Sequence, residues 1–185
     1  MEKKIDPIHI GDYAESLYRE GGFTCGEAVI SGLREKIGID VPQEIIGMAS
    51  GFAGGIGQSG CVCGAISGGA MAIGLLYGRS KPGEDASKAQ RLTRELHDGM
   101  RLEMGKNVVC CRVLTRGMDR SKGEHKPQCG RFVNMSARQT AELILGETPT
   151  LRKESKNLTK VAEKVTLLAA ATLENPQHAS GSKGK

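Results

Sequence analysis

The sequence GFAGGIGQSGCVCGAISGGAMAIGLLYG, residues 51–78, decides the fold. Its first half is too rich in glycine to be regular, and from about Cys63 to Tyr77 alanines and large aliphatic residues predict a helix. Each glycine inside a helix costs up to about 1 kcal/mol relative to alanine. The predicted helix nevertheless contains Gly64, Gly68, Gly69 and Gly74. We therefore expect its backbone to be approached closely, by a neighbouring helix or by a bound group.

Apolar residues recur at helical spacing on both sides of this stretch. They predict further helices at Cys25–Ile37, Pro42–Met48, Glu84–Met104, Ser136–Leu145 and Leu158–Leu173. Ser136, followed three residues later by Gln139, has the form of a capping box, so one helix is expected to begin there. Aromatic residues make up 3% of the chain, and no alternating strand pattern is convincing. The predicted fold class is all-α: a single-domain helical bundle with a glycine-rich loop and a C-terminal helical extension.

The boundaries follow from these patterns. We place the helical domain at residues 1–147, the C-terminal helical extension at 148–174 and a disordered tail at 175–185. The first residues lack the apolar region of a signal peptide, and the longest apolar stretch, 65–77, is too short to span a bilayer. We expect a cytoplasmic protein without a membrane span, in which cysteines are reduced.

The charge of the chain points to no special partner. The formal net charge is +5, with much of the excess in the C-terminal region. Because no basic patch is interleaved with aromatic residues, we expect no nucleic-acid partner.

Six cysteines carry the chemical information: Cys25, Cys61, Cys63, Cys110, Cys111 and Cys129. They lie near predicted helix starts or in loops, as thiols that share a redox or metal centre would. No C-x-x-C occurs, which argues against a thioredoxin-like motif and against a zinc ribbon. Cysteine is also often a small buried hydrophobic residue, so packing is the alternative for each of them.

Cys63 is the strongest candidate for function. It lies at a predicted helix N-terminus, where free amides and the helix dipole favour a thiolate and lower the thiol pKa. Cys61 and Cys63 form a C-x-C pair that could chelate a soft metal. The side chains of the adjacent Cys110 and Cys111 diverge, so one can serve a site while the other packs.

Two histidines are further candidates for a site. His125, four residues before Cys129, could join a mixed Cys/His metal site, but the basic residues around it favour a solvated loop histidine. His97, inside a predicted helix, is interpreted as structural.

The motifs together resemble a known family. Cys25-Gly-Glu-Ala-Val, the segment ASGFAGGIGQSG, Cys63-Gly-Ala-Ile-Ser-Gly-Gly, Cys111-Arg-Val-Leu and Cys129 are similar to the C-GCAxxG-C-C family, whose members are described as redox-active. The resemblance covers about residues 13–145. It implies that the four family cysteines are Cys25, Cys63, Cys111 and Cys129. Cys61 and Cys110 are then additions that could act as accessory ligands.

The resemblance leaves several chemistries open. A similar domain in split-Soret cytochromes favours an electron-transfer protein whose four cysteines ligate a [2Fe–2S] cluster, with the amides of Gly60 and Gly64 near its sulfurs. The alternative is thiol–disulfide chemistry, with Cys63 attacking and Cys25 as its partner. A zinc-stabilised structural module and a helical interaction protein with no cofactor are alternatives of other classes. A redox role requires a redox partner protein, and the glycine-lined helix could be a homodimer contact.

Overall fold

The computed structural model describes residues 5–20, 22–39 and 42–147. Within these ranges all regular structure is helical, which confirms the all-α fold class. The α-helices are α1 (Pro7–Arg19), α2 (Cys25–Leu33), α3 (Gly64–Tyr77), α4 (Ser87–Glu103), α5 (Cys111–Leu114) and α6 (Lys126–Gly146). A π-helical turn, η1 (Arg34–Gly38), continues α2, and a 3₁₀-helix, η2 (Gln43–Phe52), precedes the glycine-rich loop. The expected extension, 148–174, and tail, 175–185, lie outside the described residues.

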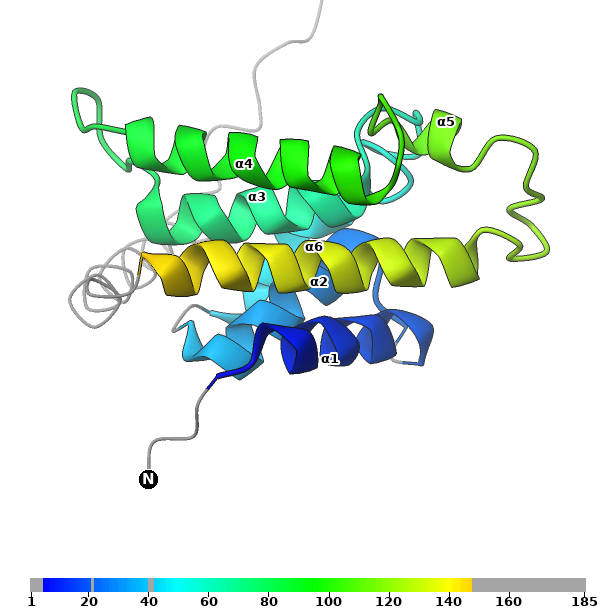
Figure 1. Ribbon diagram of the computed structural model, residues 1–185, viewed down its shortest axis with the longest axis horizontal. Helices are drawn as coiled ribbons and strands as arrows, with labels where there is room; N and C mark the ends of the chain where they lie inside the picture. Colours follow the sequence, from blue (N-terminus) through cyan, green and yellow to red (C-terminus); the bar gives the residue numbers. More distant parts are fainter. Residues whose placement is uncertain (1–4, 21, 40–41, 148–185) are drawn as a thin grey trace, which may run out of the picture.

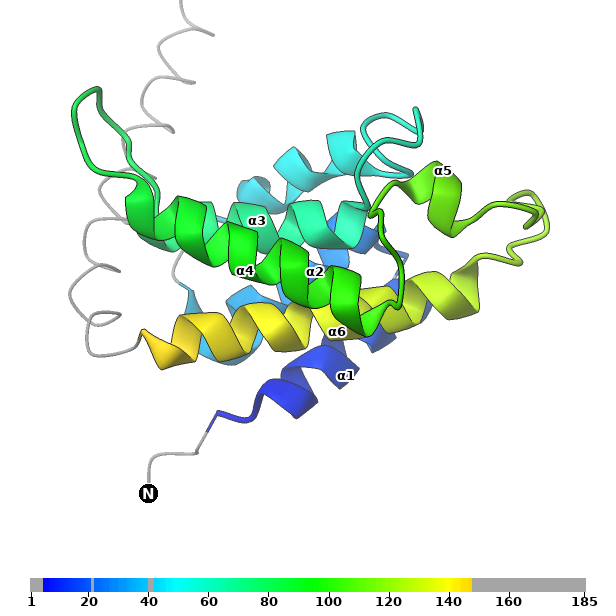
Figure 2. The same ribbon diagram turned by 45° about the horizontal axis from the view of Figure 1, so that its top comes forward.

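Helix α6 organises the bundle, because it contacts α1, α2, α3 and α4. Figure 1 shows α3 and α4 on one side of α6 and α1 on the other. In Figures 1 and 2 the N-terminal ends of α3, α5 and α6 lie at the same end of the bundle, on the right. Three segments that are far apart in sequence therefore begin close to one another.

One hydrophobic core joins the helices. Its fully buried side chains include Ile10 of α1, Leu33 of α2, Ile73 of α3, Leu96 of α4 and Ile144 of α6. A smaller buried cluster, formed by Ile30, Ile46 and Ala49, packs η2 against α2. None of the helices in the described ranges has both the length and the hydropathy needed to cross a bilayer.

The glycines of α3 allow close helix packing, as expected. A Cβ atom on Gly68 would lie 2.6 Å from the carbonyl oxygen of Gly26 in α2. A Cβ atom on Gly69 would lie 2.5 Å from Oγ1 of Thr140 in α6. Around Gly74 the space is open. The close approach predicted from the sequence is thus made by helices of the same chain at Gly68 and Gly69.

The start predicted for α6 was wrong. The helix begins at Lys126, with Pro127 in its first turn, where proline is well tolerated. Ser136 is fully buried in the middle of the helix, and its hydroxyl donates a 2.8 Å hydrogen bond to the carbonyl oxygen of Ala65. The pattern read as a capping box therefore reflects a contact between α6 and α3, not a helix start.

Helix α1 was not predicted. Its N-cap is Asp6, whose carboxylate accepts a 2.9 Å hydrogen bond from the backbone N–H of Ile8, and Pro7 follows at the first position. Only Ile10, Gly11 and Ala14 of this helix are buried. This apolar face is too short to give a clear helical period in the sequence.

Candidate functional site

A cavity of about 440 Å³ lies where the helix starts gather. Four cysteines from four helices line it: Cys25, Cys63, Cys111 and Cys129. Cys25 and Cys111 are the first residues of α2 and α5, Cys63 is the N-cap of α3, and Cys129 lies in the first turn of α6. Each thiol is therefore at the positive end of a helix dipole. The structure brings together the four residues that the family resemblance singled out.

The glycine-rich loop connects the starts of α3 and α5. Between residues 54 and 62 seven residues have positive φ: Gly54, Gly55, Ile56, Gly57, Gln58, Gly60 and Val62. The tight loop returns the chain so that the N–H of Cys63 donates to the carbonyl of Val109 at 2.8 Å, and the N–H of Arg112 donates to that of Gly60 at 3.0 Å. These two bonds hold Cys63 and Cys111 on the same side of the cavity.

Small residues bring α2 to the same place. A Cβ atom on Gly64 would lie 3.5 Å from Cβ of Cys25 and 3.0 Å from the carbonyl oxygen of Phe52. A larger residue at position 64 would push the start of α2 away. Gly64 also lines the cavity, so its backbone is accessible from the space between the thiols.

Cys25 and Cys129 influence each other's ionisation. Hydrogen bonding with Cys25 is the main cause that lowers the pKa of Cys129 to about 7. Burial opposes that shift, while the charge of Arg120 and a hydrogen bond from the hydroxyl of Tyr18 support it. The same pairing, together with burial and the neighbouring cysteines, raises the pKa of Cys25. These opposite shifts favour the thiolate at Cys129 and the thiol at Cys25.

The low pKa expected for Cys63 is not found. The backbone N–H groups of Ala65 and Ile66 do hydrogen-bond its sulfur and lower its pKa, as a helix N-terminus should. Burial is the larger effect and raises the pKa of Cys63 to about 12. The thiol is only 5% exposed, so the desolvation of a thiolate outweighs the amides.

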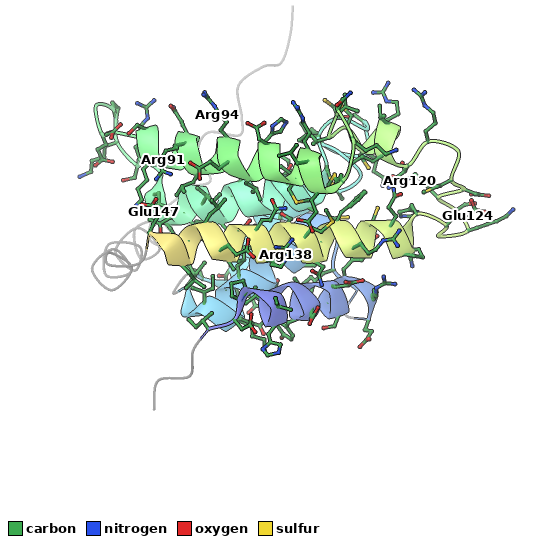
Figure 3. All side chains as sticks on the ribbon, in the orientation of Figure 1. Arg91, Arg94, Arg120, Glu124, Arg138 and Glu147 are labelled. Atoms are coloured by element: carbon green, nitrogen blue, oxygen red, sulfur yellow. The ribbon has the colours of Figure 1, made fainter. Side chains whose placement is uncertain are left out.

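Arg120 supplies the positive charge nearest to these thiols. Its Nη1 atom lies 3.5 Å from Sγ of Cys111, and its charge helps to lower the pKa of Cys129. Figure 3 shows the Arg120 side chain between α5 and the start of α6. Because a guanidinium stays charged at all relevant pH values, it favours thiolates in this cavity.

His125 is placed differently from the solvated loop histidine that the sequence suggested. Its side chain is half-buried and lines the cavity, and its Nδ1 atom is buried without a hydrogen-bond partner among the described residues. Burial, followed by the charges of Arg120 and Lys126, lowers its pKa. The imidazole is therefore neutral near pH 7. His97, in contrast, contacts Asp98 on the outside of α4.

The remaining predicted site residues do not line the cavity. Cys61 is exposed, and Cys110 is the half-buried N-cap of α5. Gly60 has φ +82°, and a Cβ atom there would lie 2.7 Å from Cβ of Arg112. Its role in the structure is to let the loop pass close to α5.

Sequence reasoning missed Tyr18 and Arg120. Tyr18 reaches the site from α1, which was not predicted, and its pKa is raised mainly by burial. Arg120 lies in the loop between α5 and α6. The spacing between Cys111 and Cys129 gave no reason to choose it among the basic residues of that loop.

The arrangement of potential metal-binding side chains bears on whether the site holds a metal ion. Over the described ranges, no three or more Cys, His, Asp or Glu side chains are arranged to hold a metal ion. Four thiolates are suitable donors for iron or zinc in chemical type. The arrangement of the described side chains does not fit a single bound ion.

Comparison with known proteins gives one match. Residues 23–143 match the family model described as "Putative redox-active protein (C_GCAxxG_C_C)". The matched segment begins before Cys25 and ends after Cys129, so it contains all four cavity cysteines. Neither the curated proteins nor the solved structures give a significant match.

Proposed function

Since the chain belongs to the C_GCAxxG_C_C family of redox-active proteins, we propose that it is a thiol–disulfide redox protein in which Cys129 attacks and Cys25 resolves. The observation that carries this proposal is that Cys25 and Cys129 line the wall of one cavity, and hydrogen bonding with Cys25 as the main cause of the lowered pKa of Cys129 supports it. Because the pKa of Cys129 is lowered to about 7, a larger fraction of this residue is thiolate at neutral pH than of an ordinary cysteine. An ordinary cysteine of pKa about 8.5 is a few per cent thiolate there.

The first step is attack on a substrate disulfide. The Cys129 thiolate attacks one sulfur of the disulfide, a new bond joins Cys129 to that sulfur, and the substrate S–S bond breaks. The other substrate sulfur leaves with the electron pair and takes a proton from water. Tyr18 and Arg120 hold the attacking sulfur as a thiolate before this step.

The second step closes the internal disulfide. The hydrogen bond to Cys129 is the largest cause of the raised pKa of Cys25, and it is lost once Cys129 carries no charge. The Cys25 thiol then gives up its proton more easily and attacks the Cys129 sulfur. The second substrate thiol leaves with the electron pair and that proton. Overall, two thiols lose two electrons and two protons, and one disulfide becomes two thiols.

This assignment replaces Cys63 as the attacking thiol. Burial keeps Cys63 protonated, since its pKa of about 12 lies far above neutral pH. A thiol must be deprotonated to attack a disulfide. Cys63 therefore lines the cavity as a neutral thiol and does not attack. Return of the Cys25–Cys129 disulfide to the dithiol requires a redox partner with thiol chemistry.

A second candidate is ligation of an iron–sulfur cluster by Cys25, Cys63, Cys111 and Cys129. Its support is that thiols from four helices line one cavity. A bound cluster would supply one-electron transfer. The described side chains contain no arrangement that holds a metal ion, so we favour the dithiol reaction. Iron content and the visible spectrum of anaerobically purified protein distinguish the two.

The dithiol proposal is tested by trapping its intermediate. Reduced protein is mixed with a small disulfide, quenched with an alkylating reagent and measured by mass spectrometry. We expect Cys25→Ser to stop at a mixed disulfide that peptide mapping places on Cys129, and Cys129→Ser to form none on Cys25. Cys61→Ser is the control and should behave as the unchanged protein, because Cys61 is exposed and away from the cavity. A mixed disulfide that forms equally well in Cys129→Ser would overturn the proposal.

A further inference from the structure

The cavity is lined by basic side chains as well as by thiols. Basic side chains on its wall are Arg19, Arg120 and Lys126, whereas Glu20 is the one carboxylate among its described lining residues. Arg19 is already paired with Glu15, at 2.6 Å. Arg120 and Lys126 have no carboxylate partner among the described residues. Lys126 thus lines the same space as Cys25 and Cys129 without a carboxylate partner among the described residues, while Arg120 lines it beside the sulfurs of Cys111 and Cys129.

His125 adds a neutral polar group to this wall. Its Nδ1 atom is buried and has no hydrogen-bond partner in the described part of the protein. His125 precedes Lys126 in sequence and lies within the electrostatic influence of Arg120. The three side chains form one polar wall, which we call the basic wall.

The size of the cavity restricts what can bind. Sites for small molecules usually enclose several hundred Å³, and about 440 Å³ falls in this range. Carboxylates are matched by guanidinium and ammonium groups, and the neutral imidazole can donate or accept one further hydrogen bond. A small anionic molecule fits these properties better than an apolar or cationic one.

We propose that the basic wall selects small disulfides that carry carboxylates as the oxidants of the Cys25–Cys129 pair. Lys126 and Arg120 bind the carboxylates, and the imidazole of His125 lies on the same wall. The disulfide of the bound molecule faces Cys129, and the exchange described above releases two carboxylate-bearing thiols. This inference rests on the proposed function and names the substrate class of that same site.

Lys126 is the residue through which the inference is best tested. Arg120 also lowers the pKa of Cys129, so its replacement would change the nucleophile as well as the binding of the substrate. Lys126 is not among the causes of the Cys129 pKa. Lys122 provides a matched control, because it carries the same charge, pairs with Asp119 at 3.5 Å and does not line the cavity.

The experiment compares three disulfides of similar size. Dithiodipropionate carries two carboxylates, 2-hydroxyethyl disulfide is neutral and cystamine is cationic. The rate of Cys25–Cys129 disulfide formation is measured with each disulfide. Each rate is divided by the rate at which a small free thiol reacts with the same disulfide, so that differences in the intrinsic reactivity of the three disulfides cancel. The normalised rates should fall from the anionic to the neutral to the cationic disulfide. We expect Lys126→Gln to slow only the anionic one, by about two- to fivefold, and Lys122→Gln to slow none.

The outcomes separate this inference from the proposed function. Equal normalised rates, a preference for cystamine or identical behaviour of Lys126→Gln and Lys122→Gln would overturn the inference. In each of these cases the pair still becomes oxidised, so the proposed function stands. Oxidation by a protein disulfide alone would likewise overturn only the inference. If no disulfide oxidises the pair at all, the proposed function itself fails.

Discussion

Cys25, the first residue of α2, and Cys129, in the first turn of α6, line the same cavity, and hydrogen bonding with Cys25 is the main cause of the lowered pKa of Cys129. The two residues come from distant parts of the chain, and helix packing alone brings them together. In a C-x-x-C motif one helix turn sets the spacing, whereas here the spacing depends on the whole bundle. The redox behaviour of the pair should therefore respond to changes in packing as well as to changes at the thiols.

The first prediction concerns pH. A thiolate is the reactive form, so the alkylation rate of Cys129 should rise with pH with a midpoint near 7. Cys25→Ala removes the main cause of the lowered pKa, and the midpoint should move upward toward the ordinary range of about 8.5. The measurement is the rate of iodoacetamide labelling of Cys129 against pH, followed by mass spectrometry. A midpoint unchanged by Cys25→Ala would contradict the assigned hydrogen bond.

The second prediction concerns Arg120. Its positive charge favours the thiolate of Cys129, so Arg120→Gln should raise the pKa of Cys129. Below pH 7 we expect labelling of Cys129 to slow by roughly threefold, because an interaction between partly exposed charges is typically of that strength. Arg116→Gln is the matched control, because Arg116 is exposed and does not line the cavity. Equal slowing in both variants would show a general charge effect instead of a local one.

The third prediction concerns the close packing of α3 against α2, at Gly68 and Gly26. A Cβ atom on Gly68 would lie 2.6 Å from the carbonyl oxygen of Gly26 and 2.9 Å from its Cα, and neither backbone atom can move easily. Gly68→Ala should lower the free energy of unfolding by about 1–3 kcal/mol. Gly74→Ala, which meets open space, should be neutral or should stabilise by up to about 1 kcal/mol. Chemical denaturation of both variants checks this pair, and equal stabilities would contradict the packing.

The fourth prediction is that the same substitution also changes the ionisation of the thiols. Gly68→Ala should separate α2 from α3 and shift Cys25 relative to α6. The pKa of Cys129 should then rise, in labelling experiments carried out where the variant is still folded. In Gly74→Ala it should stay near 7. A low pKa retained in Gly68→Ala would mean that the site tolerates movement of α2.

The helices that were predicted well are those whose packing shows as a periodic pattern. The buried residues Leu92, Leu96 and Met100 of α4 recur at helical spacing, and the run from Gly64 to Tyr77 is apolar enough to need a buried helix. The start of α6 was misplaced because Ser136 pairs with a carbonyl of another helix. A local motif cannot reveal a partner that the tertiary structure supplies.

The chemistry of the site was less predictable than its location. The helix N-terminus of Cys63 was read correctly, and the amides that it implies are present. Sequence could not show that burial would outweigh them, since burial depends on how many elements cover the thiol. The partnership of Cys25 with Cys129, and the contributions of Tyr18 and Arg120, likewise arise only when the helices pack.

The most direct test of the central claim is a redox titration read by peptide mapping. The protein is equilibrated in buffers of graded thiol-to-disulfide ratio, alkylated and digested, and the linked peptides are identified. The account predicts one reversible two-electron transition in which the Cys25 and Cys129 peptides become joined with loss of two hydrogens. Cys63 should remain a free thiol throughout, labelled once the protein is denatured. Linkage of Cys25 or Cys129 to Cys63, or no linkage of the two at any potential, would contradict it.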